Sequence, residues 1–205
     1  MYALVKNNQI TKYFQNPKGF TLNDNQYSAD IFTKWSKAEL NAIGIYEVIT
    51  DSTNYKDTAY YINTNEQYNF ADDQVTKSWG TATAKRLNDE NAVDEDGNNI
   101  LEDGVQVINY GLKTEKKRIV KQQASGLLAP TDWYVVKSTE VADYDIPANI
   151  LSFRADVRTK SNEMETQIDN CTTVDELKAL YEYTNTGTEE NPVITRPLAE
   201  FPEEI

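Results

Sequence analysis

The sequence contains few of the side chains on which enzyme active sites usually depend. It has 205 residues, no histidine and one cysteine, Cys171. Without an imidazole there can be no Ser-His-Asp or Cys-His catalysis and no histidine-ligated metal. None of the 8 glycines falls in a phosphate-binding loop or in the Gly-x-Ser-x-Gly turn of a hydrolase. We therefore expect no enzyme, no metal and no cofactor. We expect a protein that binds a partner or forms part of a larger structure.

Two other side-chain chemistries carry little information here. Paired carboxylates can hydrolyse glycosides without histidine, but 33 Asp and Glu residues offer so many pairs that none stands out. The single Cys171 cannot form an intrachain disulfide, and we expect it to be a small apolar side chain near a helix end rather than a reactive thiol.

An acidic connector over residues 88–104 partly resembles a calcium-binding loop. An EF-hand loop needs oxygen ligands at positions 1, 3 and 5, glycine at position 6 and glutamate at position 12. Counted from Asp94, position 6 is Asn99 and position 12 is Val105. The pattern fails at two required places, so the connector is better interpreted as a turn between strands.

Charge and hydropathy exclude two classes of partner. The 20 basic and 33 acidic residues give a net charge of -13, which disfavours nucleic acid because its phosphates attract Lys and Arg. The longest apolar runs are far shorter than the ~20 residues of a membrane-spanning helix. The opening residues 1–8 lack the apolar core of a secretory signal. We expect a soluble protein made in a cytoplasm, with one domain or two small ones.

Aromatic residues are the most distinctive candidates for binding. Three tryptophans, Trp35, Trp79 and Trp133, and 13 tyrosines could stack on a saccharide or anchor a protein interface. In a β-rich chain most such rings belong to the core. A carbohydrate-binding function would therefore require an exposed aromatic platform.

The first half of the chain is expected to be mostly β-structure, forming a β-rich domain over residues 1–110. A hairpin is predicted from 2–5 and 10–14, across the turn-prone Asn7-Asn8. Ser36 and Glu39 have the spacing of a capping box and predict a short helix to about residue 42. Further strands are predicted at 45–49, 59–62 and 74–81.

The second half is expected to be a helical module over residues 111–183, followed by an extended acidic, proline-containing tail over 184–205. Apolar residues at helical spacing predict helices over 114–128 and 147–170. A second capping box at Thr173 predicts a short helix. The aromatic and β-branched run 133–137 predicts a strand between the helices. The fold class is therefore α+β, with a helix-strand-helix-helix order in the C-terminal module.

A basic cluster marks the start of the first of these helices, at Lys113, Lys116, Lys117, Arg118 and Lys121. The cluster could bind an anionic partner, although the favoured interpretation is a solvated face of the helix. Positive charges are disfavoured at a helix N-terminus, so they could instead pair with the acidic connector.

Several segments together form a recognisable pattern. They are Gly126–Trp133 (GLLAPTDW), Ile146-Pro147, Phe153–Arg158 (FRADVR), Met1–Asn7 (MYALVKN), Leu40–Val48 and the acidic ending 200–204. The pattern resembles tailed-bacteriophage tail-fibre assembly proteins and fibre-associated proteins, and it covers about half of the chain in scattered pieces.

This resemblance implies a structural protein of the virion tail that associates with a tail-fibre or baseplate protein. The alternatives are a fibre-assembly chaperone that is absent from the virion, and a carbohydrate-binding protein of the fibre tip that contacts a host surface glycan. The resemblance also admits a homo-oligomer such as a trimer. The long Tyr- and Asn-rich region 55–110 departs from the shorter assembly proteins and favours a structural role.

Five residues are candidates for interaction. Trp133 is expected to be buried and to hold its strand against the preceding helix. Arg154 and Arg158 are expected to make two-oxygen bonds to carboxylates, either within the chain or on a partner. Trp35 and Trp79 are further candidates for anchors or stacking surfaces.

Overall fold

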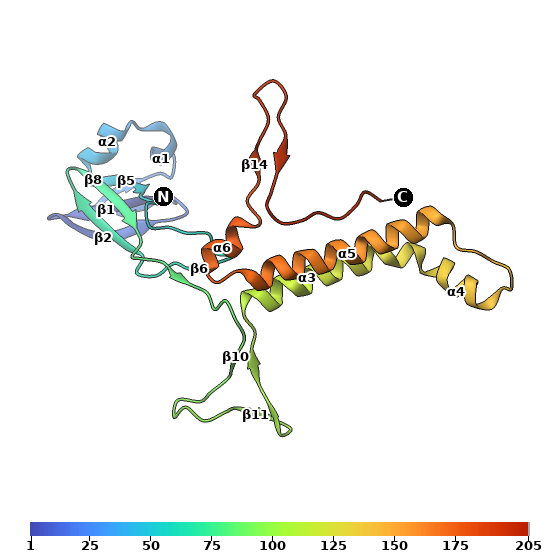
Figure 1. Ribbon diagram of the computed structural model, residues 1–205. Helices are drawn as coiled ribbons and strands as arrows, with labels where there is room; N and C mark the ends of the chain where they lie inside the picture. Colours follow the sequence, from blue (N-terminus) through green and yellow to red (C-terminus); the bar gives the residue numbers. More distant parts are fainter. Residues whose placement is uncertain (205) are drawn as a thin grey trace. The chain divides into compact units, whose positions relative to one another are not determined.

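The computed structural model describes residues Met1–Glu204, which fold into two compact units (Figure 1). The first unit runs from Met1 to Thr83, and the second begins at Ala84. The first is rich in strands and the second contains the long helices, which confirms the predicted α+β class. The sequence-based boundary at residues 110 and 111 lies at the start of a helix, whereas the compact units divide earlier in the chain.

The first unit is built on a five-stranded sheet with the order β2-β1-β5-β8-β7. Its strands are β1 (Tyr2–Lys6), β2 (Gln9–Phe14), β5 (Ile45–Thr50), β7 (Gln67–Ala71) and β8 (Gln74–Ser78). Neighbouring strands are antiparallel, except that β5 and β8 are parallel. The outer strands β2 and β7 approach each other, because the ring centroids of Tyr13 and Tyr68 are only 4.7 Å apart. The sheet is therefore strongly curled.

Three hairpins of this unit turn on pairs of Asn and Asp residues. The pairs are Asn7-Asn8, Asn23-Asp24 and Asp72-Asp73, with φ between 49° and 62°. Two-residue turns with both residues in the left-handed region match the twist of the flanking strands, and Asn and Asp tolerate this conformation best after glycine. The predicted first hairpin is confirmed, and its turn residues explain why.

Both faces of the sheet carry buried side chains. One face packs a cluster of buried side chains: Leu4, Phe14, Leu22, Ile31, Phe32, Leu40 and Ile45. The opposite, concave face carries Ala3, Val5 and Val75, with Tyr46 and Phe70 packed against them. Alternate residues of β1 thus point to opposite faces, as the two-residue period of a strand requires.

Small elements complete the first unit. They are β3 (Phe20–Leu22), β4 (Asn25–Tyr27), α1 (Ile31–Lys34), α2 (Lys37–Ala42) and β6 (Tyr61–Ile62), and β9 (Thr83–Ala84) begins at the last residue of this unit. The capping box predicted for α2 is present, since Glu39 N–H donates to Ser36 Oγ and Ser36 N–H donates to Glu39 Oε2. The strand predicted at 45–49 is found as β5, and the one predicted at 74–81 is found as β8 but ends at Ser78. The one predicted at 59–62 is reduced to β6.

The second unit contains short strands and five helices among its described residues. The strands are β10 (Glu90–Asn91), β11 (Leu101–Glu102), β12 (Val105–Gln106), β13 (Ile108–Asn109), β14 (Thr184–Asn185) and β15 (Ile194–Thr195). The helices are α3 (Leu112–Leu128), the 3-10 helix η1 (Ala129–Thr131), α4 (Asp132–Glu140), α5 (Ala148–Asn170) and α6 (Val174–Ala179). Helices α3 and α5 lie side by side (Figure 1).

The beginning of α3 explains why residues 84–110 belong to the helical unit. The first N–H groups of a helix have no partner within the helix. Here Leu112 N–H donates to Arg86 O at 2.9 Å, and Lys113 N–H donates to Leu87 O at 3.1 Å. The connector thus caps the helix that follows it.

The predicted helices at 114–128 and 147–170 are confirmed as α3 and α5, and the capping box at Thr173 opens α6. Between α3 and α5 the structure corrects the prediction. Residues 133–137 form part of helix α4 and not a strand, so the C-terminal module contains four consecutive helical segments before the short α6.

The tail does not simply extend away from the unit. Strands β14 and β15 pair as a hairpin, and the chain then returns to α5. The Gln167 side chain binds this returning segment twice, donating to Pro197 O at 3.0 Å and accepting from Ala199 N–H at 2.8 Å. Leu198 is only 2% exposed. The segment around Leu198 is therefore part of the packed unit.

Candidate protein-interaction site

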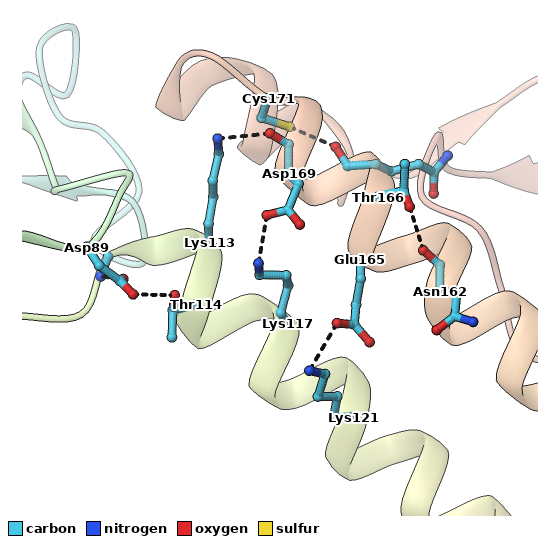
Figure 2. Close-up of polar contacts among 12 residues, drawn as sticks. Asp89, Lys113, Thr114, Lys117, Lys121, Asn162, Glu165, Thr166, Asp169 and Cys171 are labelled. Carbon is cyan, nitrogen blue, oxygen red and sulfur yellow. Dashed lines mark hydrogen bonds and ion pairs between the residues drawn. The ribbon is translucent and has the colours of Figure 1, made fainter.

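Three lysines of the basic cluster join α3 to α5 (Figure 2). Lys117 Nζ lies 2.7 Å from Asp169 Oδ1, and Lys121 Nζ lies 3.2 Å from Glu165 Oε2. Lys113 Nζ donates to the backbone oxygen of Asp169 at 3.0 Å. The close partners of these lysines are therefore two carboxylates and a carbonyl of α5, and Arg118 pairs with Glu115 within α3. The alternative that these side chains bind the acidic connector is wrong, although Lys117 does act on Asp89 of the connector through its charge.

The connector contributes Asp89, which caps the N-terminus of α3 (Figure 2). Its carboxylate accepts from Gly111 N–H at 2.7 Å and from Thr114 Oγ1 at 2.9 Å. These two hydrogen bonds lower the pKa of Asp89 below its ordinary value, and the one from Gly111 has the larger effect. The positive charge of Lys117 lowers this pKa further. A carboxylate at this end of a helix is favoured by the helix dipole.

Cys171 lies at the C-terminal end of α5 and is buried. Its Sγ contacts Gln167 O at 3.4 Å. Burial, helped by the negative charge of Glu176, raises the pKa of the thiol. The thiolate is the reactive form of cysteine, so this environment suits a packing role and not a nucleophile.

Arg154 joins three segments at the opposite end of the helix pair. It projects from α5 and is only 7% exposed. Its Nη1 donates to Leu128 O at 3.0 Å and to Thr131 Oγ1 at 2.6 Å, and its Nη2 lies 2.8 Å from Asp132 Oδ1. The carboxylate predicted to bind Arg154 therefore lies within the chain, and Arg154 fixes the start of α4 against α5.

The same contacts help to explain why α4 is a helix. Val135 and Val136 favour strands, which is the basis of the prediction. However, Pro130 lies in a 3-10 turn that leads directly into α4, and Asp132 stands in the first turn, where the dipole favours an acid. The Arg154 contacts hold this turn in place. Tertiary contacts thus override a local preference.

Helix α4 has no buried residue. Trp133 is 50% exposed and Val136, one turn further on, is 53% exposed, with Val135 also exposed. We call these three side chains the α4 surface. The expectation that Trp133 is buried is wrong, because residues 133–137 form a helix that buries none of its residues instead of a strand.

The α4 surface has polar and aromatic neighbours. The ring centroids of Trp133 and Tyr134 are 4.0 Å apart, and Lys137 Nζ lies 5.4 Å from the centroid of the Trp133 ring. The same ammonium lies 4.2 Å from the Tyr144 ring. Rings held between a neighbouring ring and a cation lose less entropy on binding than free side chains do.

The remaining candidates lie elsewhere. Arg158 is exposed and donates to the backbone oxygen of Arg154 at 3.2 Å, so its described contact is a carbonyl and not the predicted carboxylate. Trp35 and Trp79 belong to the first unit. Trp35 lines a shallow cavity with Tyr2 and Leu40, and Trp79 is half-buried beside Tyr55.

Sequence reasoning missed Thr131 and Asp132 as partners of Arg154. One signal could have found them. Arg154 falls on the apolar stripe of α5, between Ile150 and Val157, where an arginine must be paired when it is buried.

The acidic connector contains an Asx turn. Asp94 Oδ1 accepts from Asp96 N–H at 3.0 Å and from Asn98 N–H at 2.9 Å. These backbone bonds, with the Asn98 side chain, lower the pKa of Asp94.

Within Met1–Glu204 no three His, Cys, Asp or Glu side chains are grouped as metal ligands would be. Nor does any helix in that range have the length and apolar character to cross a membrane.

Comparison with known proteins adds no relative. Neither the family models, nor the curated proteins, nor the solved structures contain a match to this chain. The assignment of function therefore rests on the α4 surface and on the residues quoted above.

Proposed function

We propose that this chain is a structural protein of a bacteriophage tail, which binds a tail-fibre or baseplate protein through the α4 surface. The observation that carries the proposal is a helix with no buried residue, held in place by a buried arginine. Exposed apolar side chains that are grouped on one element often mark a protein-interaction site. The segment Gly126–Trp133, which carries the resemblance to fibre-associated proteins, ends on this surface.

The chemistry of the α4 surface indicates what its partner offers. Trp133 would enter an apolar pocket, since tryptophan is the most frequent anchor of protein interfaces. The exposed carboxylates of Glu140, Asp143 and Asp145 follow in the chain. A partner pocket with Lys or Arg at its rim would match them, because opposite charges at a rim steer association.

Quantitative mass spectrometry of purified phage particles tests the role in the tail. The phage is the one whose genome encodes this chain. A fixed copy number that matches the symmetry of the tail supports the proposal. Absence from particles, with capture by a fibre protein in infected-cell lysate, would make the chain an assembly chaperone instead.

A pull-down with tagged full-length chain tests the surface. We expect Trp133→Ala and Val136→Ser to reduce capture of the fibre or baseplate protein by roughly tenfold or more, as for interface anchors. Trp35→Ala is the matched control, because Trp35 is a partly exposed tryptophan of the other unit. Equal capture by all three variants would refute the α4 surface as the binding site.

A further inference from the structure

Four aromatic rings and one ammonium in the first unit are connected by successive short contacts. The Tyr13 and Tyr68 rings are 4.7 Å apart, and the Lys77 Nζ lies 5.6 Å from the Tyr68 ring. The same Nζ lies 4.8 Å from the Trp79 ring, which in turn is 4.7 Å from the Tyr55 ring. We call these five side chains the aromatic row.

The fold brings the aromatic row together from distant parts of the chain. Tyr13 comes from β2 and Tyr68 from β7, the two outer strands of the curled sheet. Tyr68 is paired across the sheet with Lys77 of β8, and Trp79 follows β8 directly. Tyr13 is 44% exposed and Tyr55 is 45% exposed, while Tyr68 and Trp79 are half-buried. The two rings at the ends of the row are therefore exposed, and the side chains in its middle are partly accessible to solvent.

Glu66 holds the middle of the row in one arrangement. Its carboxylate accepts from the Tyr68 hydroxyl at 2.8 Å and lies 2.8 Å from Lys77 Nζ. The hydrogen bond from Lys77, followed by that from Tyr68, lowers the pKa of Glu66, and the bond to Glu66 raises the pKa of Lys77. Because these side chains are already ordered, a ligand would not have to order them on binding.

We propose that the aromatic row is a binding site for an oligosaccharide. One face of a pyranose ring consists of C–H groups, which pack on aromatic rings, and its hydroxyls can bond with an ammonium or a carboxylate. The row offers both kinds of group, with two rings on either side of the ion pair between Lys77 and Glu66. Because rings lie on both sides of the ion pair, the row suits several linked sugar units better than a single one.

Two observations favour a saccharide over a protein partner. The centre of a protein interface is depleted of charged residues, whereas the centre of this row is an ion pair. In addition, the acidic excess of the chain lies mainly in residues 84–205, so that the first unit carries little net charge and suits a neutral ligand.

The test is binding of the full-length chain to an array of immobilised neutral and acidic oligosaccharides from bacterial and eukaryotic surfaces. The strongest binder is then titrated in solution by calorimetry. We expect Tyr55→Ala and Trp79→Ala to weaken binding by roughly tenfold or more each, as the loss of a stacking ring does elsewhere. Tyr13→Ala gives a third test at an exposed position, where folding is least affected.

Two controls separate this site from other surfaces. Trp35→Ala removes a tryptophan of the same unit that lies outside the row, and Trp133→Ala removes the anchor of the α4 surface. Both should leave oligosaccharide binding unchanged, so failure here does not bear on the proposed tail function.

Three results would overturn the proposal. The first is no binding to any oligosaccharide on the array. The second is binding that survives Tyr13→Ala, Tyr55→Ala and Trp79→Ala in folded variants. The third is capture of a proline-rich peptide through Tyr55 and Trp79 without capture of any oligosaccharide, which would assign the row to a protein ligand.

Discussion

Arg154 Nη1 lies 2.6 Å from the hydroxyl oxygen of Thr131, and both side chains are at least nine-tenths buried. This contact crosses from α5 to the turn that precedes α4. Because a buried guanidinium must be satisfied, the position of the α4 surface depends on it.

Removal of Arg154 should therefore destabilise the second unit. Arg154→Met leaves Thr131 Oγ1 and Leu128 O without this donor, and we expect the free energy of unfolding to fall by about 1–3 kcal/mol. Urea unfolding followed by circular dichroism measures it. Arg158→Met is the matched control, with an expected change within about 0.5 kcal/mol, because Arg158 is exposed. Equal effects of the two substitutions would contradict this role.

The exposure of Trp133 leads to a different expectation. Trp133→Ala should change the free energy of unfolding by less than about 1 kcal/mol, since the ring adds little to the core. A buried ring, as the strand prediction implied, would cost about 3–5 kcal/mol. The same urea experiment separates the two values.

Asp89 should make stability depend on pH in acid. Its pKa is lowered in the folded chain, so its stabilising contribution is present above its ordinary pKa of 3.8 and is lost as the pH falls through the folded value. Asp89→Asn should therefore have a lower melting temperature than wild type at pH 7. That difference should narrow below about pH 4, because wild type then loses the same charge. A difference that stays constant with pH would exclude this mechanism.

Cys171 should react slowly in the folded chain. Burial raises the pKa of its thiol, so we expect iodoacetamide to label it far more slowly than a free cysteine at pH 8. In 6 M guanidinium chloride, about the concentration that unfolds most domains, labelling should reach the rate of a model thiol. Rapid labelling under native conditions would show that the end of α5 opens.

Gln167 should hold the C-terminal segment around Leu198 against α5. Gln167→Ala removes both hydrogen bonds to Pro197 and Ala199, and we expect faster proteolysis of the segment around Leu198. Thr166→Ala is the control on the same helix, since its hydroxyl donates only to Asn162 O. Chymotrypsin can cleave after Leu198, so the rate of this cleavage in limited chymotrypsin digestion, followed by mass spectrometry, distinguishes Gln167→Ala from Thr166→Ala.

Local signals predicted much of the fold. The capping boxes at Ser36 and Thr173 and the Asn7-Asn8 turn were correct because each is satisfied by residues a few positions away. The strand predicted at 133–137 was wrong because its state depends on Arg154, which lies 23 positions from Thr131.

The candidate site was less predictable for the same reason. Trp133 and Arg154 were identified, but which of them is buried follows from the path of the chain between α3 and α5. The pairing of Lys117 with Asp169 spans 52 positions, and 33 acidic residues compete for such a partner in the sequence. Only the packing of α3 against α5 determines which acidic residue pairs with Lys117.

All three tryptophans are at least partly exposed, and this has a spectroscopic consequence. The intrinsic fluorescence of the folded chain should resemble that of hydrated indole and should shift little on unfolding. The emission of each tryptophan instead depends on whether the surface on which it lies is covered. A ligand that shields Trp79 or a partner that covers Trp133 would move the emission to shorter wavelength, and single-tryptophan variants would identify the occupied surface in one cuvette.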